Sequence, residues 1–163
     1  MQNNALALQN LAEMYQHGEG ITADEKLAQT LYTLCATLPV INTESQRESG
    51  FNNAILECRR ELGKSMLIGV KDDQEKLRLA AFWINLSLVQ NEETKEDSEI
   101  GLRARRTVAE TRELLAVLMK KLNQESIQWI DENTKNWDAF RVYINDTTSF
   151  PFTELDCGNY KES

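Results

Sequence analysis

Apolar residues recur at intervals of three and four along most of this chain, and this spacing constrains the fold more than any other feature. Residues spaced in this way share one face of a helix, and that face is buried against a neighbouring element. The chain contains only seven Gly and two Pro, which leaves few turns for a many-stranded sandwich or barrel. We therefore expect an all-α fold of antiparallel helical hairpins. The predicted apolar stripes span residues 7–15, 27–35, 51–66, 77–89 and 104–122.

Turn and capping residues set the expected ends of the first two helices. The sequence Gly18-Glu19-Gly20-Ile21 should end the first helix, because glycine adopts turn conformations that other residues avoid. Thr22 or Asp24 can cap the second helix by accepting hydrogen bonds from its first N–H groups. Pro39 should end that second helix, because proline lacks the N–H that a helix interior requires.

The helix expected over residues 77–89 is apolar almost all round. Its polar positions are Arg78, Asn85 and Ser87. A helix without a polar face belongs at the centre of the fold, where neighbours cover it on every side. Asp72 or Asp73 lies just before it and can cap its first turn.

The second half of the chain is expected to complete the same single domain, residues 1–163. Residues 91–97 form a charged linker to a long helix over 98–122. An apolar segment over 127–144 favours a further helix over a strand. We expect residues 98–145 to cap the hairpins of residues 1–90, and residues 146–163 to form an irregular tail.

Small, aromatic and glycine residues in the first 36 positions follow the pattern A-x-x-x-L-G-x-x-Y-x-x-G-x-G-V-x-x-D-x-x-x-A-x-x-W-Y-x-x-A-A. The residues in register are Ala7, Leu11, Ala12, Tyr15, Gly18, Gly20, Ile21, Asp24, Ala28, Leu31, Tyr32, Cys35 and Ala36. This segment resembles the Sel-one-like repeat (SLR) family, which is related to tetratricopeptide (TPR) repeats. Ala12, Ile21 and Leu31 depart from the family's glycine, valine and tryptophan. The resemblance implies a short right-handed TPR/SLR-like superhelix in which these residues are scaffold.

A degenerate second copy of the repeat is expected over about residues 58–88. It begins at Leu62-Gly63, continues through Met66 and Gly69-Val70, and includes Asp73, Ala80 and Trp83. The distance from Leu11 to Leu62 exceeds a standard repeat, so an insertion is expected at about residues 40–50. The resemblance covers about half of the chain and leaves the C-terminal half as a cap or an elaboration.

The charge of the chain excludes some classes of partner. Its 26 acidic and 18 basic residues give a formal net charge of −8, which disfavours binding to nucleic acid.

We expect no membrane insertion, since no stretch approaches the length of apolar sequence that a spanning helix needs. The N-terminal sequence has no signal-peptide pattern. We therefore expect a cytoplasmic location by default, or a periplasmic one if a leader has been removed.

The chain offers few residues for catalysis or for binding a metal. His17 is the only histidine, so a paired-histidine metal site is excluded and a Ser-His-Asp triad would have to use it. Its position at the end of the first helix suits an interaction with the helix dipole. Neither a phosphate-binding P-loop nor a G-x-S-x-G elbow is present. We expect a protein that is not an enzyme and has no cofactor, no catalytic residues and no metal site.

The three cysteines leave two alternatives open. Some SLR relatives from oxidising compartments join the end of one repeat to the start of the next, so the resemblance implies a Cys35–Cys58 disulfide. The other alternative is that both are small buried thiols packed as hydrophobic residues. Cys157 lies in an acidic tail with no visible base to activate it.

The predicted partner-binding residues point away from the apolar stripes of the first and third helices. They are Gln9, Glu13, Gln16, Arg59, Arg60 and Lys64. The C-terminal aromatic residues are expected mostly in the core, with a minority as anchors for a partner. They are Trp129, Trp137, Phe140, Tyr143, Phe150 and Phe152.

These observations predict a non-catalytic protein-binding module. Small SLR-like proteins neutralise secreted effectors in some bacteria, so the resemblance implies an immunity protein that binds a toxin in interbacterial competition. An acidic domain would associate faster with a basic toxin. The alternatives are an SLR adaptor for an endogenous complex, and an enzyme or ligand-binding protein with its site in the C-terminal half.

Overall fold

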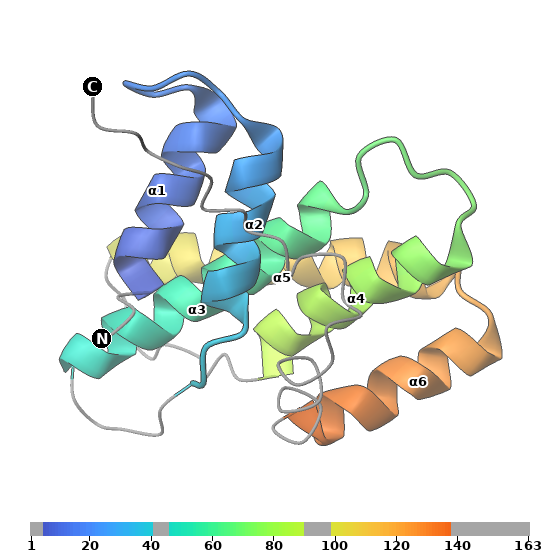
Figure 1. The fold of residues 1–163 in the computed structure, drawn as a ribbon. Helices are drawn as coiled ribbons and strands as arrows, with labels where there is room; N and C mark the ends of the chain where they lie inside the picture. The colour runs from blue at the N-terminus through green and yellow to red at the C-terminus, as the bar shows by residue number, and fades with distance from the viewer. Residues whose placement is uncertain (1–4, 41–45, 90–98, 138–163) are drawn as a thin grey trace.

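The computed structural model describes residues 5–40, 46–89 and 99–137, and in these ranges it contains helices and no strands (Figure 1). The all-α prediction is confirmed for this part of the chain. The helices are α1 (Ala5–His17), α2 (Glu25–Ala36), α3 (Gln46–Ser65), α4 (Gln74–Val89), α5 (Glu99–Met119) and α6 (Gln124–Lys135).

The turn between α1 and α2 forms as its sequence predicts. Gly18 and Gly20 have φ angles of 71° and 77°, in the left-handed region that strongly favours glycine. The side chain of Asp24 accepts a hydrogen bond from the backbone N–H of Leu27 at 3.0 Å and so caps α2. The short turn makes the two helices an antiparallel hairpin.

Helices α1 to α4 stack as two hairpins. α1 packs against α2, and α3 packs against both of them, while α4 pairs with α3. In Figure 1, α1 and α2 stand side by side on the left, and α6 lies below α4 on the right. Both α5 and α6 contact α4. The C-terminal helices therefore meet at α4, which also packs against α3.

The burial of α4 follows from its sequence. Its buried residues are Leu77, Ala80, Ala81, Phe82, Trp83, Ile84, Leu86 and Ser87. Asp73 accepts hydrogen bonds from the backbone N–H groups of Glu75 and Lys76, both at 3.1 Å, and so caps the helix. α3 approaches α4 closely at Gly63, where an added Cβ would lie 2.8 Å from the carbonyl oxygen of Ala80.

The end of α5 and the start of α6 differ from the sequence prediction. α5 ends at Met119, so Leu122 lies in the following turn, although it is buried as expected. The Asn123 side chain accepts a hydrogen bond from the N–H of Ser126 at 2.8 Å and begins α6. The predicted segment over 127–144 is helical up to Lys135. Phe140, Tyr143, Phe150, Phe152, Cys157 and the tail over 146–163 lie outside the described residues.

Two residues of the repeat pattern have an unexpected environment. The sequence places Ala7 and Leu11 on the inner stripe of α1, yet both are exposed, Leu11 over 39% of its surface. Ala12, the next residue, is fully buried instead. α1 packs against both α2 and α3, and these contacts bury Ala12 rather than Leu11.

Candidate partner-binding site

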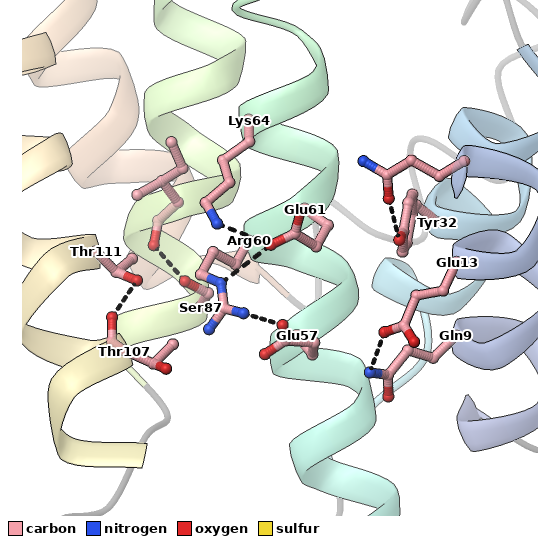
Figure 2. A network of polar contacts seen from close by, with 12 residues as sticks. Gln9, Glu13, Tyr32, Glu57, Arg60, Glu61, Lys64, Ser87, Thr107 and Thr111 are labelled. Carbon is pink, nitrogen blue, oxygen red and sulfur yellow. Dashed lines mark hydrogen bonds and ion pairs between the residues drawn. The ribbon is translucent and has the colours of Figure 1, made fainter. Parts of the chain in front are cut away.

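A row of polar side chains runs along α1 and ends at a tyrosine of α2. The Gln9 side-chain amide donates a hydrogen bond to Glu13 Oε1 at 2.8 Å. One turn further along α1, Gln16 Oε1 accepts a hydrogen bond from the Tyr32 hydroxyl at 2.6 Å. The spacing of these α1 residues, four and then three, puts them on one face of the helix. Figure 2 shows Gln9, Glu13 and Tyr32 on the same side of α3.

A second polar row, on α3, is held together by ion pairs. Arg60 pairs with Glu57 and, at 3.3 Å, with Glu61. Lys64 pairs with Glu61 at 2.9 Å. In Figure 2, Arg60 and Lys64 lie on one side of α3 and Tyr32 lies on the other side. Glu61 lies between them. The two basic side chains are therefore neutralised by carboxylates of their own helix.

Tyr32 lies where the two rows meet. Its side chain is almost fully buried, and this burial raises the pKa of its hydroxyl well above the ordinary value. The carboxylates of Glu61 and Glu13 raise the pKa further, while Arg60 lowers it. A negative charge on the phenol would be poorly solvated and repelled by both acids. Tyr32 is therefore a neutral hydrogen-bond donor at physiological pH.

A cavity of about 410 Å³ opens beside Tyr32. Its lining comes from α1, from the turn before α2, from α2 itself and from the end of α3. The lining residues are Gln16, Ala23, Glu25, Ala28, Gln29, Tyr32, Ser65 and Ile68. The cavity thus continues the polar face of α1 towards the turn that follows α3.

Arg59 corrects the sequence prediction, because it is fully buried rather than on the partner-binding face. Its Nε donates to the carbonyl oxygen of Ala36 at 3.0 Å, and its Nη2 donates to that of Leu38 at 3.2 Å. These carbonyls lie at and beyond the end of α2, where helix geometry leaves them without partners. The sequence already indicated that Arg59 is buried. It lies four residues after Ile55 and three residues before Leu62, so it shares the apolar face of the helix with them.

A disulfide joins Cys35 of α2 to Cys58 of α3, with Cα atoms 5.9 Å apart. Both side chains are fully buried. The bond lies next to Arg59, so a covalent link and a buried cation hold the end of α2 on α3 together. This corresponds to the disulfide alternative that the family resemblance implies.

Trp129 and Trp137 belong to an aromatic cluster on α4. Phe82 lies 5.5 Å from Trp129 and 5.6 Å from Trp137, measured between ring centroids. Two arginines lie over these indole rings, Arg59 at 5.4 Å from Trp137 and Arg78 at 4.6 Å from Trp129. Trp137 is buried and Trp129 half-buried, so the cluster serves mainly to attach α6 and the residues just after it to α4.

A second cavity, of about 420 Å³, lies among α4, α5 and α6. Its lining residues are Asn85, Met119, Gln124, Ile127, Gln128, Ile130 and Asp131. Asp131, its single acid, pairs with Lys135 at 2.6 Å, and both side chains are more than half exposed. This arrangement is typical of a solvated helix surface. No group of three or more metal-binding side chains occurs in the described ranges.

No protein-family model, curated protein or solved structure matches this chain. The resemblance to the SLR family therefore depends on the residues quoted above. Among the described helices, none combines the length and apolar character that crossing a membrane requires.

Proposed function

We propose that this chain is a non-catalytic protein-binding domain whose partner contacts the face formed by α1, Tyr32 and α3. The observation that carries this proposal is the link that Tyr32 makes between the two neighbouring helices. Its hydroxyl bonds to Gln16 of α1, and the charges of Glu13 on α1 and Arg60 on α3 affect its pKa. Lys64, the other predicted binding cation of α3, lies on the side of α3 away from Tyr32 (Figure 2). Amide, carboxylate and ammonium groups gathered on adjacent helices suit the polar contacts of a protein interface.

The chemistry of Tyr32 supports binding rather than catalysis. A tyrosine that acts as a base or nucleophile needs a lowered pKa, whereas burial and two nearby carboxylates raise the pKa of this one. The Tyr32 hydroxyl already donates to Gln16. These groups hold one another in fixed positions, which lowers the entropy lost when a partner binds.

We further propose that α1–α4 form the start of a right-handed SLR-like superhelix and that the chain is an immunity protein. The stacked hairpins, the glycine turn and the Asp24 cap support the repeat assignment. The net charge of −8 favours a basic toxin as partner. The Cys35–Cys58 disulfide suits an oxidising compartment such as the periplasm, where secreted effectors arrive.

The decisive experiment is co-expression and pull-down of the full chain with each of the two neighbouring gene products. We expect one neighbour to be toxic alone, harmless with this chain, and bound with nanomolar affinity. Binding of a non-toxic housekeeping partner would favour the adaptor alternative. If neither neighbour binds, the immunity proposal is wrong.

Variants of the full chain then test the binding face. Glu13→Lys reverses an acidic charge on the proposed face, and we expect it to weaken binding of a basic toxin. Glu132→Lys makes the same change on α6, where Glu132 accepts a bond from Gln128 as Glu13 does from Gln9, and serves as the matched control. Equal effects of the two variants would contradict the choice of face.

A further inference from the structure

The cavity beside Tyr32 has the size and composition of a site for part of a polypeptide. Its volume of about 410 Å³ lies within the range of about 300–1,000 Å³ that is typical of ligand pockets. α1, α2 and the end of α3 contribute to the lining, so the three packed elements fix its shape. It is therefore a built hollow rather than a gap beside one helix.

The lining can form hydrogen bonds with an extended backbone. Gln16 uses its side-chain oxygen for Tyr32, which leaves its amide N–H groups to donate. Gln29 adds a second side-chain amide with both a donor and an acceptor. Ser65 donates to the carbonyl of Leu62, so its oxygen can still accept. The backbone of an extended polypeptide presents alternating N–H donors and C=O acceptors, which can pair with these side-chain groups.

The same cavity has an aliphatic edge. Ala23 and Ala28 line its wall, and Ile68 lies at its margin with 67% of its surface exposed. Long basic side chains bury their methylene stems along such surfaces while the charged ends stay hydrated or paired. The edge therefore suits a lysine or an arginine of a partner better than a short polar side chain.

The charges around the cavity favour a positively charged side chain of the partner. Arg60 and Lys64 are already paired with carboxylates of α3. Glu13 accepts from the neutral amide of Gln9, and Glu25 lines the cavity at the first turn of α2. Within the described ranges neither Glu13 nor Glu25 forms an ion pair. The region therefore has an excess of negative charge, which repels anions and attracts cations.

We propose that this cavity receives an extended segment of the partner protein and that a lysine or arginine of this segment lies between Ile68 and Glu25. The inference depends on the protein-binding function proposed above and adds the chemistry of the partner. Gln16, Gln29 and Ser65 bind the segment's backbone, and Glu13 adds to the attraction at longer range.

The test uses a display library of random twelve-residue peptides selected on the immobilised full chain, followed by affinity measurements on synthetic copies. We expect the selected peptides to be enriched in lysine and arginine. Glu25→Gln should weaken their binding about threefold to tenfold at low salt. Gln29→Lys, which adds a competing charge inside the cavity, should weaken it at least about tenfold.

Matched controls exist on α6. Glu125 lies in the first turn of α6 as Glu25 does in α2, so Glu125→Gln repeats the charge change elsewhere. Gln128 lines the other cavity, so Gln128→Lys matches Gln29→Lys. Both controls should bind the peptides within about twofold of the unmodified protein, and thermal melting should verify that all four variants are folded.

Three results would overturn the inference: no selected peptide, selected peptides without basic residues, or equal binding by the cavity variants and their α6 controls. Any of these would leave the protein-binding proposal intact if a neighbouring gene product still binds the full chain. Conversely, basic peptides that need Glu25, together with no bound neighbour, would support the cavity and contradict the immunity proposal.

Discussion

Two adjacent arginines on α3 show how strongly local position controls the role of a residue. Arg59 and Arg60 have the same side chain, yet the helix rotates about 100° between them. Arg59 is consequently fully buried against the end of α2, whereas Arg60 forms partly buried ion pairs with Glu57 and Glu61. The two side chains are chemically identical, but they should contribute different amounts to the free energy of unfolding.

Arg59→Met should lower the free energy of unfolding by about 2–4 kcal/mol, because the carbonyls of Ala36 and Leu38 lose a charged donor while still buried. Arg60→Met is the matched comparison and should cost less, about 1–2 kcal/mol, because its ion pairs with Glu57 and Glu61 keep part of their contact with solvent. Urea unfolding followed by circular dichroism measures both. Equal losses would show that Arg59 does not stabilise the end of α2.

Tyr32 should make stability depend on pH in the alkaline range. Its pKa is raised above the ordinary 10.0, so above pH 10 the unfolded chain releases the proton while the folded protein keeps it. The free energy of unfolding should then fall by up to about 1.4 kcal/mol per pH unit, and the contribution is fully present below pH 10.

Tyr32→Phe provides the comparison for this effect. It should cost about 1 kcal/mol at pH 7 through loss of the bond to Gln16. It should also flatten the alkaline loss of stability, measured as urea midpoints between pH 8 and 11. Parallel curves for the two proteins would refute the raised pKa.

At the scale of elements, close helix approach depends on small residues at defined positions. Gly63 brings α3 against α4, where Ile84 Cγ1 lies 2.6 Å from the position of an added Cβ. The repeat resemblance identified this glycine as part of the degenerate second copy. The structure supplies the physical reason, since the backbone carbonyl of Ala80 is also too near for a side chain.

Gly63→Ala should therefore destabilise the protein by about 1–3 kcal/mol, although alanine favours helix over glycine. Ser65→Ala, two residues later on α3, is the control and should change stability by less than about 1 kcal/mol. Thermal unfolding by calorimetry distinguishes the two. A stabilised Gly63→Ala protein would mean that α3 and α4 can separate without cost.

For the molecule as a whole, α4 and the Cys35–Cys58 bond connect parts that are distant in the sequence. The aromatic cluster attaches α6 and Trp137 to α4, and Arg59 extends from this cluster to the end of α2. The disulfide fixes α2 on α3 in the same region. The two halves of the described chain therefore share one core.

Reduction of the disulfide should lower the free energy of unfolding by about 3 kcal/mol, because the bond closes a loop between residues 23 apart. Protein unfolded in denaturant without a reductant should expose a single reactive thiol, that of Cys157. A thiol-specific reagent measures the number of reactive thiols, and the same measurement after reduction is the control. Three reactive thiols before reduction would exclude the bond.

The amino-acid sequence by itself determined the helical class, the first hairpin turn, the Asp24 cap and the burial of α4. These features depend on periodicity and on the backbone preferences of nearby residues, which are local properties. It also identified Gln9, Glu13, Gln16, Arg60 and Lys64 as candidates, since their spacing puts them outside the apolar stripes.

Only the tertiary structure decided which of these candidates meet and what surrounds them. Arg59 became a buried donor because the end of α2 lies against it, and Tyr32 became the centre of the polar face because α1 and α3 approach it. The end of α5 and the packing of α5 and α6 on α4 likewise depend on long-range contacts. Such contacts join residues far apart in the chain, and local periodicity contains no information about their distance in space.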